Sequence, residues 1–155
     1  MTIPVLFRNH FQMGYVVRNM DKAIENLRSK FGVAKWRTLE MPPGEEVKCL
    51  GFSYVQDSMI ELIEMRPGQE IFFKPWIPES DRAMRLNHLG YMMKTEEEWD
   101  SVSRQFEAAG FQIAVSRSLG DVRFQYYDTV AELGHYCEIT YLGPTAKDFF
   151  DAPRN

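Results

Sequence analysis

The pattern of apolar and polar residues in the first half of the chain predicts a strand, a helix and three further strands. Residues 11–18 are rich in β-branched and aromatic side chains, a composition that favours a strand. Apolar residues then recur at helical spacing until Gly32, in a stripe of Met20, Ala23, Ile24, Leu27 and Phe31. Three later segments, 34–41, 47–55 and 59–65, again have strand composition. The first half is therefore predicted to be βαβββ.

The second half of the chain repeats this order. A strand is predicted at 89–94, and Thr95 with Glu98 has the spacing of a capping box that begins a helix. Trp99, Val102 and Phe106 give this helix one apolar face. Strand composition returns in three segments, at 112–117, 122–127 and 135–141. The two halves therefore share one predicted element order.

Short segments of the two halves also resemble each other directly. The sequence QMGYVVR at positions 12–18 corresponds to HLGYMMK at positions 88–94, and each copy precedes a helical pattern that stops at a glycine. A repeat that occurs only twice and at long spacing indicates a duplicated half-domain rather than a stacked array. We predict one α+β domain over 1–155, in which modules 8–66 and 86–143 are joined by a crossing segment, 67–85, and followed by a tail, 144–155.

Composition and charge exclude several classes of protein. The 155 residues include 45% hydrophobic and 26% charged residues and carry a formal net charge of −4, as in a soluble globular domain. No basic stripe suggests a nucleic-acid partner, and no apolar run approaches the roughly 20 residues needed to span a membrane. The first eight residues lack the pattern of a signal peptide. We expect a cytoplasmic protein in which Cys49 and Cys137 are buried thiols.

Polar residues stand at equivalent places in the two halves. Gln12 and His88 each open a first strand, two residues before a glycine, while Glu61 and Glu138 lie inside apolar runs of the last strands. Taken singly, each has an ordinary structural explanation, such as a strand edge or a solvent-facing side chain. Together they suggest a shared site, because buried carboxylates require a compensating partner and a divalent cation would supply it.

These segments resemble the vicinal oxygen chelate superfamily, which includes glyoxalase I, methylmalonyl-CoA epimerase, extradiol dioxygenases and bleomycin-resistance proteins. The resemblance rests on FQMGYVVRNMDKAI, MIELIEM, NHLGYMMK and GHYCEITYL in this order. It implies that the two modules form a cupped half-barrel sheet around one metal ion. The implied ligands are Gln12, Glu61, His88 and Glu138, a pattern closest to the glyoxalase I and epimerase branch.

The implied ligand set narrows the expected chemistry. One imidazole, one amide and two carboxylates suit one divalent ion such as Zn, Ni, Co or Mn. Gln12 stands where extradiol dioxygenases have a histidine, and bleomycin-resistance proteins lack the ligands. We expect a metal-dependent isomerase, epimerase or lyase for a small substrate with adjacent oxygens, acting through a stabilised enolate and a carboxylate proton shuttle. The alternatives are a non-catalytic small-molecule binding or resistance protein and, more weakly, a ring-cleaving dioxygenase.

The resemblance also suggests roles for individual residues. Glu138 would move the proton as in glyoxalase I, and Glu46 is a second candidate by analogy with the epimerase branch. Val16 replaces the arginine with which glyoxalase I anchors glutathione, which argues against a glutathione hemithioacetal. Arg123 is a candidate anchor for an anionic group of the substrate, and Met92 and Tyr127 are candidates for an apolar pocket. By analogy with the family, we expect a homodimer.

Overall fold

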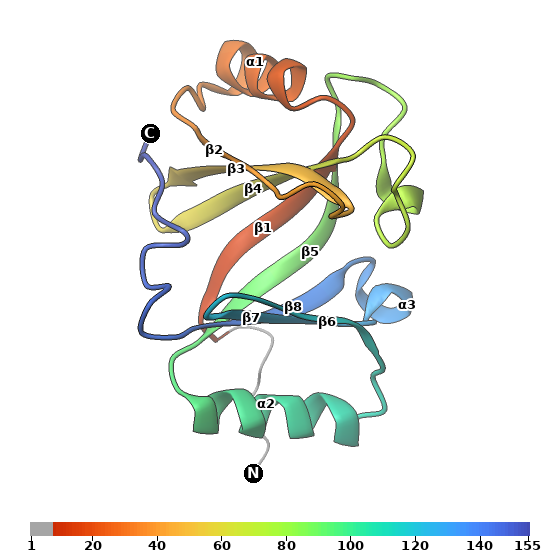
Figure 1. Cartoon of the computed structure of the whole chain (residues 1–155), viewed down its shortest axis with the longest axis vertical. Coiled ribbons are helices and arrows are strands. Elements are labelled where there is room, and N and C mark those ends of the chain that lie inside the picture. Colours follow the sequence, from red (N-terminus) through yellow and green to blue (C-terminus); the bar gives the residue numbers. More distant parts are fainter. Residues whose placement is uncertain (1–7) are drawn as a thin grey trace. The chain divides into compact units, whose positions relative to one another are not determined.

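The computed structural model describes residues 8–155 and has the predicted element order in both halves, with one additional short helix, α3, in the second half (Figure 1). In the first half, the elements are β1 (His10–Val17), α1 (Met20–Phe31), β2 (Arg37–Glu40), β3 (Val47–Val55) and β4 (Ser58–Met65). In the second half, they are β5 (Met84–Met93), α2 (Glu96–Ala108), β6 (Ile113–Leu119), β7 (Val122–Tyr127), α3 (Val130–Leu133) and β8 (Tyr136–Leu142). A 3-10 turn, η1 (Lys74–Trp76), lies in the crossing segment. Residues 1–7, for which we predict no signal peptide, lie outside the described residues.

The strands follow the order β2-β3-β4-β1-β5-β8-β7-β6 in one sheet. The chain divides into two compact units, which we name by the half that supplies most of each. The second-half unit contains residues 8–12 and His88–Phe150, and the first-half unit contains Met13–Asn87 and Asp151–Asn155. The described helices include none that is long and apolar enough to cross a membrane. The predicted module boundaries differ from these units and stay a prediction.

In the first-half unit, α1 is fixed at both ends and packs through its apolar face. The Asn19 side chain accepts a hydrogen bond from the Lys22 N–H at 3.0 Å, and Gly32 ends the helix with a φ of 74° that favours glycine. A carboxylate oxygen of Glu64 on β4 accepts the Met20 N–H at 2.7 Å, so it satisfies a free donor at the helix start. The buried stripe comprises Met20, Ala23, Ile24 and Leu27, four of the five predicted residues. The fifth, Phe31, is 68% exposed.

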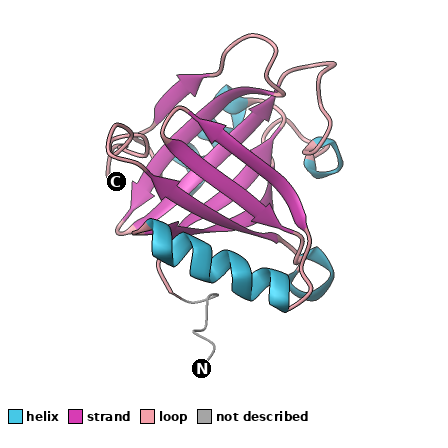
Figure 2. Ribbon diagram, turned by 60° about the horizontal axis from the view of Figure 1, so that its bottom comes forward, coloured by secondary structure: helices cyan, strands magenta, loops and turns pink. Residues whose placement is uncertain are grey.

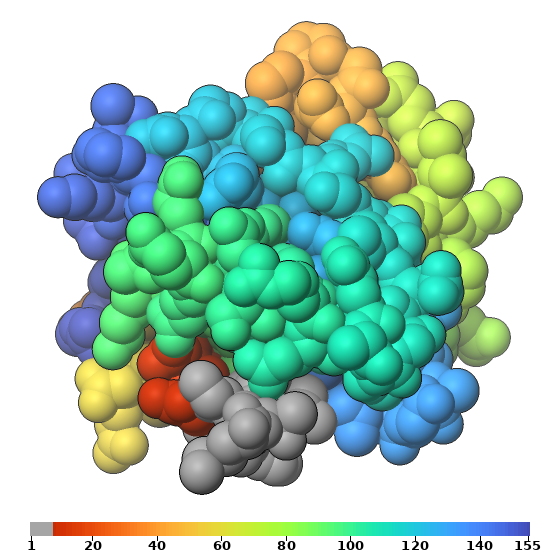
Figure 3. All heavy atoms as spheres, turned by 90° about the horizontal axis from the view of Figure 1, so that it is seen from below, coloured from red at the N-terminus to blue at the C-terminus, as the bar shows by residue number. Residues whose placement is uncertain are grey.

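In the second-half unit, α2 packs against β8 (Figure 2), and its side chains lie in the middle of the face seen in Figure 3. The Thr95 side chain accepts the Glu98 N–H at 3.1 Å, as the capping box predicts. The Glu98 side chain, however, accepts the N–H of Lys94 at 2.7 Å, and not that of Thr95 as in a standard capping box. The ring of Phe106 stacks on Tyr127 with centroids 4.2 Å apart. The buried core of this unit contains Tyr91, Met93, Trp99, Val102, Phe106, Tyr127, Cys137 and Ile139.

The segment 151–155 belongs to the first-half unit, and the side chains of its last two residues hold it in place. Asn155 accepts the N–H groups of Ala34 and Lys35, each at 2.8 Å, and donates to Ser53 Oγ at 2.7 Å. The Arg154 guanidinium lies over the Tyr54 ring at 4.8 Å. The tail is therefore bound at its last residues by several polar contacts.

Replacing Asn155 with alanine should lower the free energy of unfolding by about 1–2 kcal/mol, because its side chain joins the segments around Ala34 and Ser53. Urea denaturation would measure the change. Lys147→Ala, an exposed change in the same tail, is the control and should leave the midpoint unchanged. Equal midpoints for both variants would contradict this role for Asn155.

The two cysteines are buried and unpaired, which confirms the sequence expectation. Burial is the main cause that raises the pKa of Cys49 to about 12, and the nearby Glu64 carboxylate adds to it. Burial likewise raises the pKa of Cys137. Because the thiolate is the reactive form, both thiols should be inert in the folded protein.

At pH 8, a thiol reagent such as dithionitrobenzoate should react very slowly with the native protein and rapidly with both cysteines in guanidinium chloride. Native reactivity should increase only at much higher pH, because a raised pKa keeps the thiol neutral. The absorbance of the released thiolate measures both rates. Stoichiometric labelling of the native protein within minutes would show that these side chains are accessible and ionised.

Candidate metal centre

Three of the predicted ligands meet in the second-half unit. Gln12 comes from β1, His88 from β5 and Glu138 from β8, and their exposed fractions are 0%, 0% and 4%. The Nε2 atom of His88 lies 2.9 Å from Glu138 Oε2 and 3.1 Å from Gln12 Oε1. An imidazole nitrogen, a carboxylate oxygen and an amide oxygen thus converge on one point.

Gly90 makes this convergence possible. It lies directly beside Glu138 in the parallel pairing of β5 with β8. A Cβ atom at position 90 would lie 2.6 Å from Gln12 Oε1 and 2.9 Å from Gln12 Cβ, closer than such atoms approach each other. The glycine two residues after His88 therefore leaves the space that the Gln12 side chain occupies.

The Glu138 carboxylate is compensated by several neighbours. Its Oε1 accepts the Thr140 hydroxyl at 2.5 Å, and its Oε2 faces His88. Burial acts to raise its pKa, but the charge of His88 and the hydrogen bonds from His88, Thr140 and Tyr126 together outweigh burial and lower this pKa. The side chain therefore stays an anion, as a ligand for a cation must.

An aromatic wall borders these polar atoms. Tyr126 on β7 pairs directly with Glu138 on β8, so the two side chains share a face of the sheet. The Tyr126 ring meets the His88 ring edge-on, with centroids 4.9 Å apart. Phe124 and Tyr136 extend the wall, with ring centroids 6.1 and 6.2 Å from that of Tyr126. Met92 also lies on this face, because it pairs with Thr140, and it is half-buried.

Two predicted substrate-binding residues lie on the other face of the sheet. Arg123 pairs with Tyr141, and its guanidinium lies 4.8 Å over Trp99 and 5.0 Å over Tyr141. Tyr127 pairs with Cys137 and packs under α2. Side chains alternate along a strand, so both point away from the Glu138 face. Arg123 and Tyr127 therefore lie apart from the cluster of His88, Gln12 and Glu138.

Two predicted carboxylates belong to the first-half unit. Glu61 lies on β4, pairs with Phe52 on β3 and is only 6% exposed. Glu46 precedes β3, and its Oε1 accepts the N–H groups of Ile71 and Phe73 at 2.8 and 2.9 Å. This engagement ties the Glu46 carboxylate to the crossing segment, whereas Glu61 is a buried acid inside an apolar run, as predicted.

Thr140 is the contributor that our sequence analysis missed. It is fully buried and donates to Glu138, two residues before it on β8. The alternation of side chains along the predicted strand 135–141 already placed the two on one face. A threonine in an apolar strand is common, however. Its position on the same face as Glu138 becomes informative only once Glu138 has been assigned to the site.

The donor atoms fit a divalent cation. Gln12 Nε2 is buried and, among the described residues, has no hydrogen-bond partner, whereas the oxygen of the same amide faces His88. The amide is thus held with its ligating atom toward the cluster. A nitrogen donor with an amide and a carboxylate oxygen is a suitable set for Zn, Ni, Co or Mn.

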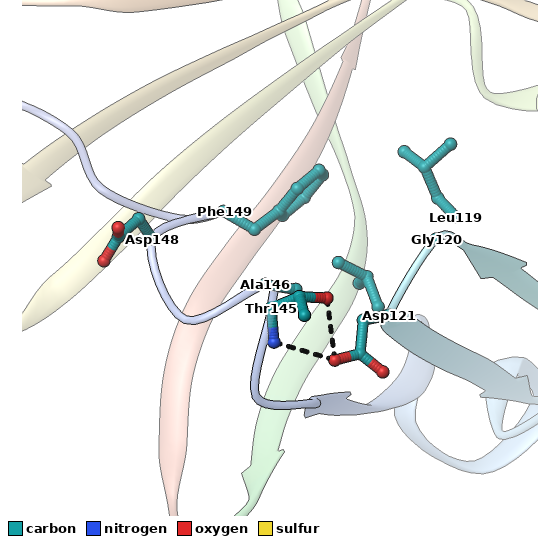
Figure 4. A pocket seen from close by; sticks show the side chains of 8 residues that line it. Leu119, Gly120, Asp121, Thr145, Ala146, Asp148 and Phe149 are labelled. Atoms are coloured by element: carbon teal, nitrogen blue, oxygen red, sulfur yellow. Dashed lines mark hydrogen bonds between the residues drawn. The ribbon is translucent and has the colours of Figure 1, made fainter.

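A separate pocket of about 380 Å³ lies in the second-half unit between the β6–β7 turn and the tail (Figure 4). One of its two acidic side chains, Asp121, accepts the Thr145 N–H at 2.9 Å and the Thr145 hydroxyl at 3.0 Å. This carboxylate therefore holds the turn after β8, and the pocket presents no cluster of converging ligands.

Residues 11–126 match the family model of the Glyoxalase/Bleomycin resistance protein/Dioxygenase superfamily, so the chain belongs to that superfamily. This match confirms the superfamily that the sequence motifs suggested. The search of curated proteins found no match.

Solved structures of methylmalonyl-CoA epimerases resemble this fold. A Streptomyces coelicolor variant in complex with 2-nitronate-propionyl-CoA has a TM-score of 0.65 at 13% identity and covers 88% of this chain and 96% of its own. The same values describe a methylmalonyl-CoA epimerase in complex with methylmalonyl-CoA and NH4+. The Mycobacterium tuberculosis epimerase has a TM-score of 0.62 at 16% identity, with coverage of 94% and 95%. These likenesses confirm the predicted fold, an α+β half-barrel of eight strands.

Replacing Gly90 with alanine should destabilise the protein by about 1–3 kcal/mol, because the added methyl group overlaps Gln12. Thermal or urea unfolding would measure this loss. Gln12→Ala removes the nearer of the two clashing atoms, so the double variant should lose less than the sum of the single losses. Strict additivity would show that Gln12 does not occupy this space.

Proposed function

We propose that this protein is a divalent-metal-dependent epimerase or isomerase that moves a proton on a carbon next to a carbonyl group. The observation that supports this proposal most strongly is the buried contact of His88 Nε2 with the Glu138 carboxylate and the Gln12 amide oxygen. Membership of the superfamily and the likeness to epimerases support this type of activity. The proposal also includes a lyase that acts through the same kind of stabilised enolate.

In this proposal, His88, Glu138 and Gln12 hold the ion together with Glu61. Glu61, His88 and Glu138 are buried side chains of the kinds that can ligate a metal. Glu61 is included because its position in the first half corresponds to that of Glu138 in the second. A divalent ion held there would supply Lewis acidity that stabilises negative charge on a substrate oxygen.

The chain's own residues would have three tasks. The two carboxylates would balance the charge of the ion, and Glu138 would also accept and return the proton. The Tyr126 ring would cover one side of His88 and limit the access of water. Met92 would contribute the apolar part of the pocket. Glu46 is a less favourable base, because backbone N–H groups already occupy its Oε1.

For the substrate, we propose a small acyl thioester or related carbonyl compound with a second oxygen nearby. Methylmalonyl-CoA, which is bound in one of the similar epimerases, has this chemistry. Val16 in place of the glutathione-anchoring arginine of glyoxalase I is consistent with another kind of substrate. From the family analogy, we also propose that the protein acts as a cytoplasmic homodimer.

Protein purified without a histidine tag should bind about one divalent ion per chain when soaked with Zn, Ni, Co or Mn, as measured by elemental analysis. His88→Ala and Glu138→Gln should each remove most of the metal, because each deletes a donor. His135→Ala, which changes a histidine whose ring contacts the Tyr136 carbonyl, is the matched control and should retain the metal.

The loaded protein should also exchange the 2-proton of methylmalonyl-CoA with deuterium from D₂O, observed by NMR. Failure of wild-type protein to bind any of the four metals would overturn the enzyme proposal. Metal and ligand binding without exchange, for this and for related acyl thioesters, would instead favour the non-catalytic binding protein.

A further inference from the structure

We infer that Thr140 and Tyr126 are positioning residues that hold the Glu138 carboxylate in the orientation required to ligate a metal ion. This inference rests on the proposed metal site and adds two residues that do not themselves ligate the ion. It concerns contacts inside the second-half unit, where all the atoms involved belong to neighbouring strands.

Thr140 controls one oxygen of the carboxylate. Its side chain is completely buried, and its hydroxyl donates to Glu138 Oε1. The residues that pair with Thr140 on the two adjacent strands are Met92 and Phe124, which are both apolar. A valine would therefore suit these neighbours as well as a threonine does. The hydroxyl is explained by Glu138 and not by the packing around it.

Tyr126 contacts the same carboxylate from the adjacent strand, β7. It pairs with Glu138 across β7 and β8, is only 4% exposed, and its side chain hydrogen-bonds the carboxylate. Its ring simultaneously packs edge-on against His88. One side chain thus touches two members of the cluster and links the direction of the imidazole to that of the carboxylate.

The contact with Thr140 engages one oxygen of Glu138, and the other oxygen is directed toward the cluster. Oε1 is engaged by Thr140, whereas Oε2 lies 2.9 Å from the His88 nitrogen that also faces Gln12. A carboxylate that could rotate freely would lose entropy on binding a cation. Thr140 and Tyr126 remove that cost before the ion arrives, which is how residues behind the ligands commonly strengthen a metal site.

The inference is distinguishable from a purely structural role for the two hydroxyl groups. If they only satisfied a buried anion, their loss would lower stability and leave metal affinity unchanged. If they position Glu138, Thr140→Val and Tyr126→Phe should each weaken Co²⁺ binding about 10-fold or more. They should also change the visible absorption of bound Co²⁺, which reports ligand geometry.

The experiment titrates the full chain with Co²⁺ and records affinity, the visible spectrum and the unfolding midpoint of metal-free protein. Thr140→Ser keeps the hydroxyl and should stay within about twofold of wild type. Thr129→Val is the matched control, because it removes a buried threonine hydroxyl that donates to the His135 carbonyl at 2.6 Å and not to Glu138. It should lower stability while it leaves Co²⁺ affinity and the spectrum unchanged.

Wild-type affinity and an unchanged spectrum in both Thr140→Val and Tyr126→Phe would overturn the inference and leave the proposed metal site intact. Failure of wild-type protein itself to bind Co²⁺, Zn²⁺, Ni²⁺ or Mn²⁺ would remove the proposed site and the inference with it. Should Thr140→Val not fold, Tyr126→Phe decides the question, with Thr140→Ser as the folded reference.

Discussion

The burial of the Glu138 carboxylate is the constraint on which the arrangement of the second-half unit depends. An ionised acid this deep in a sheet is costly unless donors surround it, and the surrounding strands supply them: His88 from β5, Thr140 from β8 and Tyr126 from β7. Gly90 keeps the adjacent position on β5 empty, so that Gln12 can reach the same place. The negative charge of Glu138 thus accounts for the identity of one residue on each of β5, β7 and β8.

Buried carboxylates elsewhere in the chain are compensated differently. Glu64 accepts the Met20 N–H at the start of α1 and the Lys48 ammonium at 2.8 Å, and Glu46 accepts two N–H groups of the crossing segment. Backbone donors are fixed by the fold, so these two acids stabilise a helix start and a loop. The donors described above for Glu138 are side chains, and the histidine nitrogen among them can exchange its proton for a cation. A bond from a backbone N–H thus marks Glu64 and Glu46 as structural acids, and the contact with a histidine marks Glu138 as a candidate ligand.

Much of this organisation could be predicted from the sequence, because it depends on local patterns. The repeat of glycine and tyrosine after Gln12 and His88 identified the first strand of each half. The apolar stripe identified α1, and the capping box identified the start of α2. The face on which an isolated side chain lies was harder to predict. Arg123 and Tyr127 were expected near the substrate, yet the pairing of β7 with β8 places both under α2. The role of Thr140 could not be predicted from the sequence, because it consists only of the hydrogen bond to Glu138. The short helix α3 also gave no periodic signal.

The alternation along β8 has a consequence for how the chain can misfold. Cys137 and Ile139 pack in the core under α2, while Glu138 and Thr140 belong to the polar cluster on the opposite face. A slip of one residue in the pairing of β8 would drive an ionised acid into the hydrocarbon under α2 and turn two apolar side chains toward His88. In such a mispaired state, the Glu138 carboxylate lacks the hydrogen bonds that it has in the native structure, so the energy of this state lies well above that of the native register. The same acid that suits this strand for ligating a metal thereby acts as a checkpoint against incorrect strand pairing during folding.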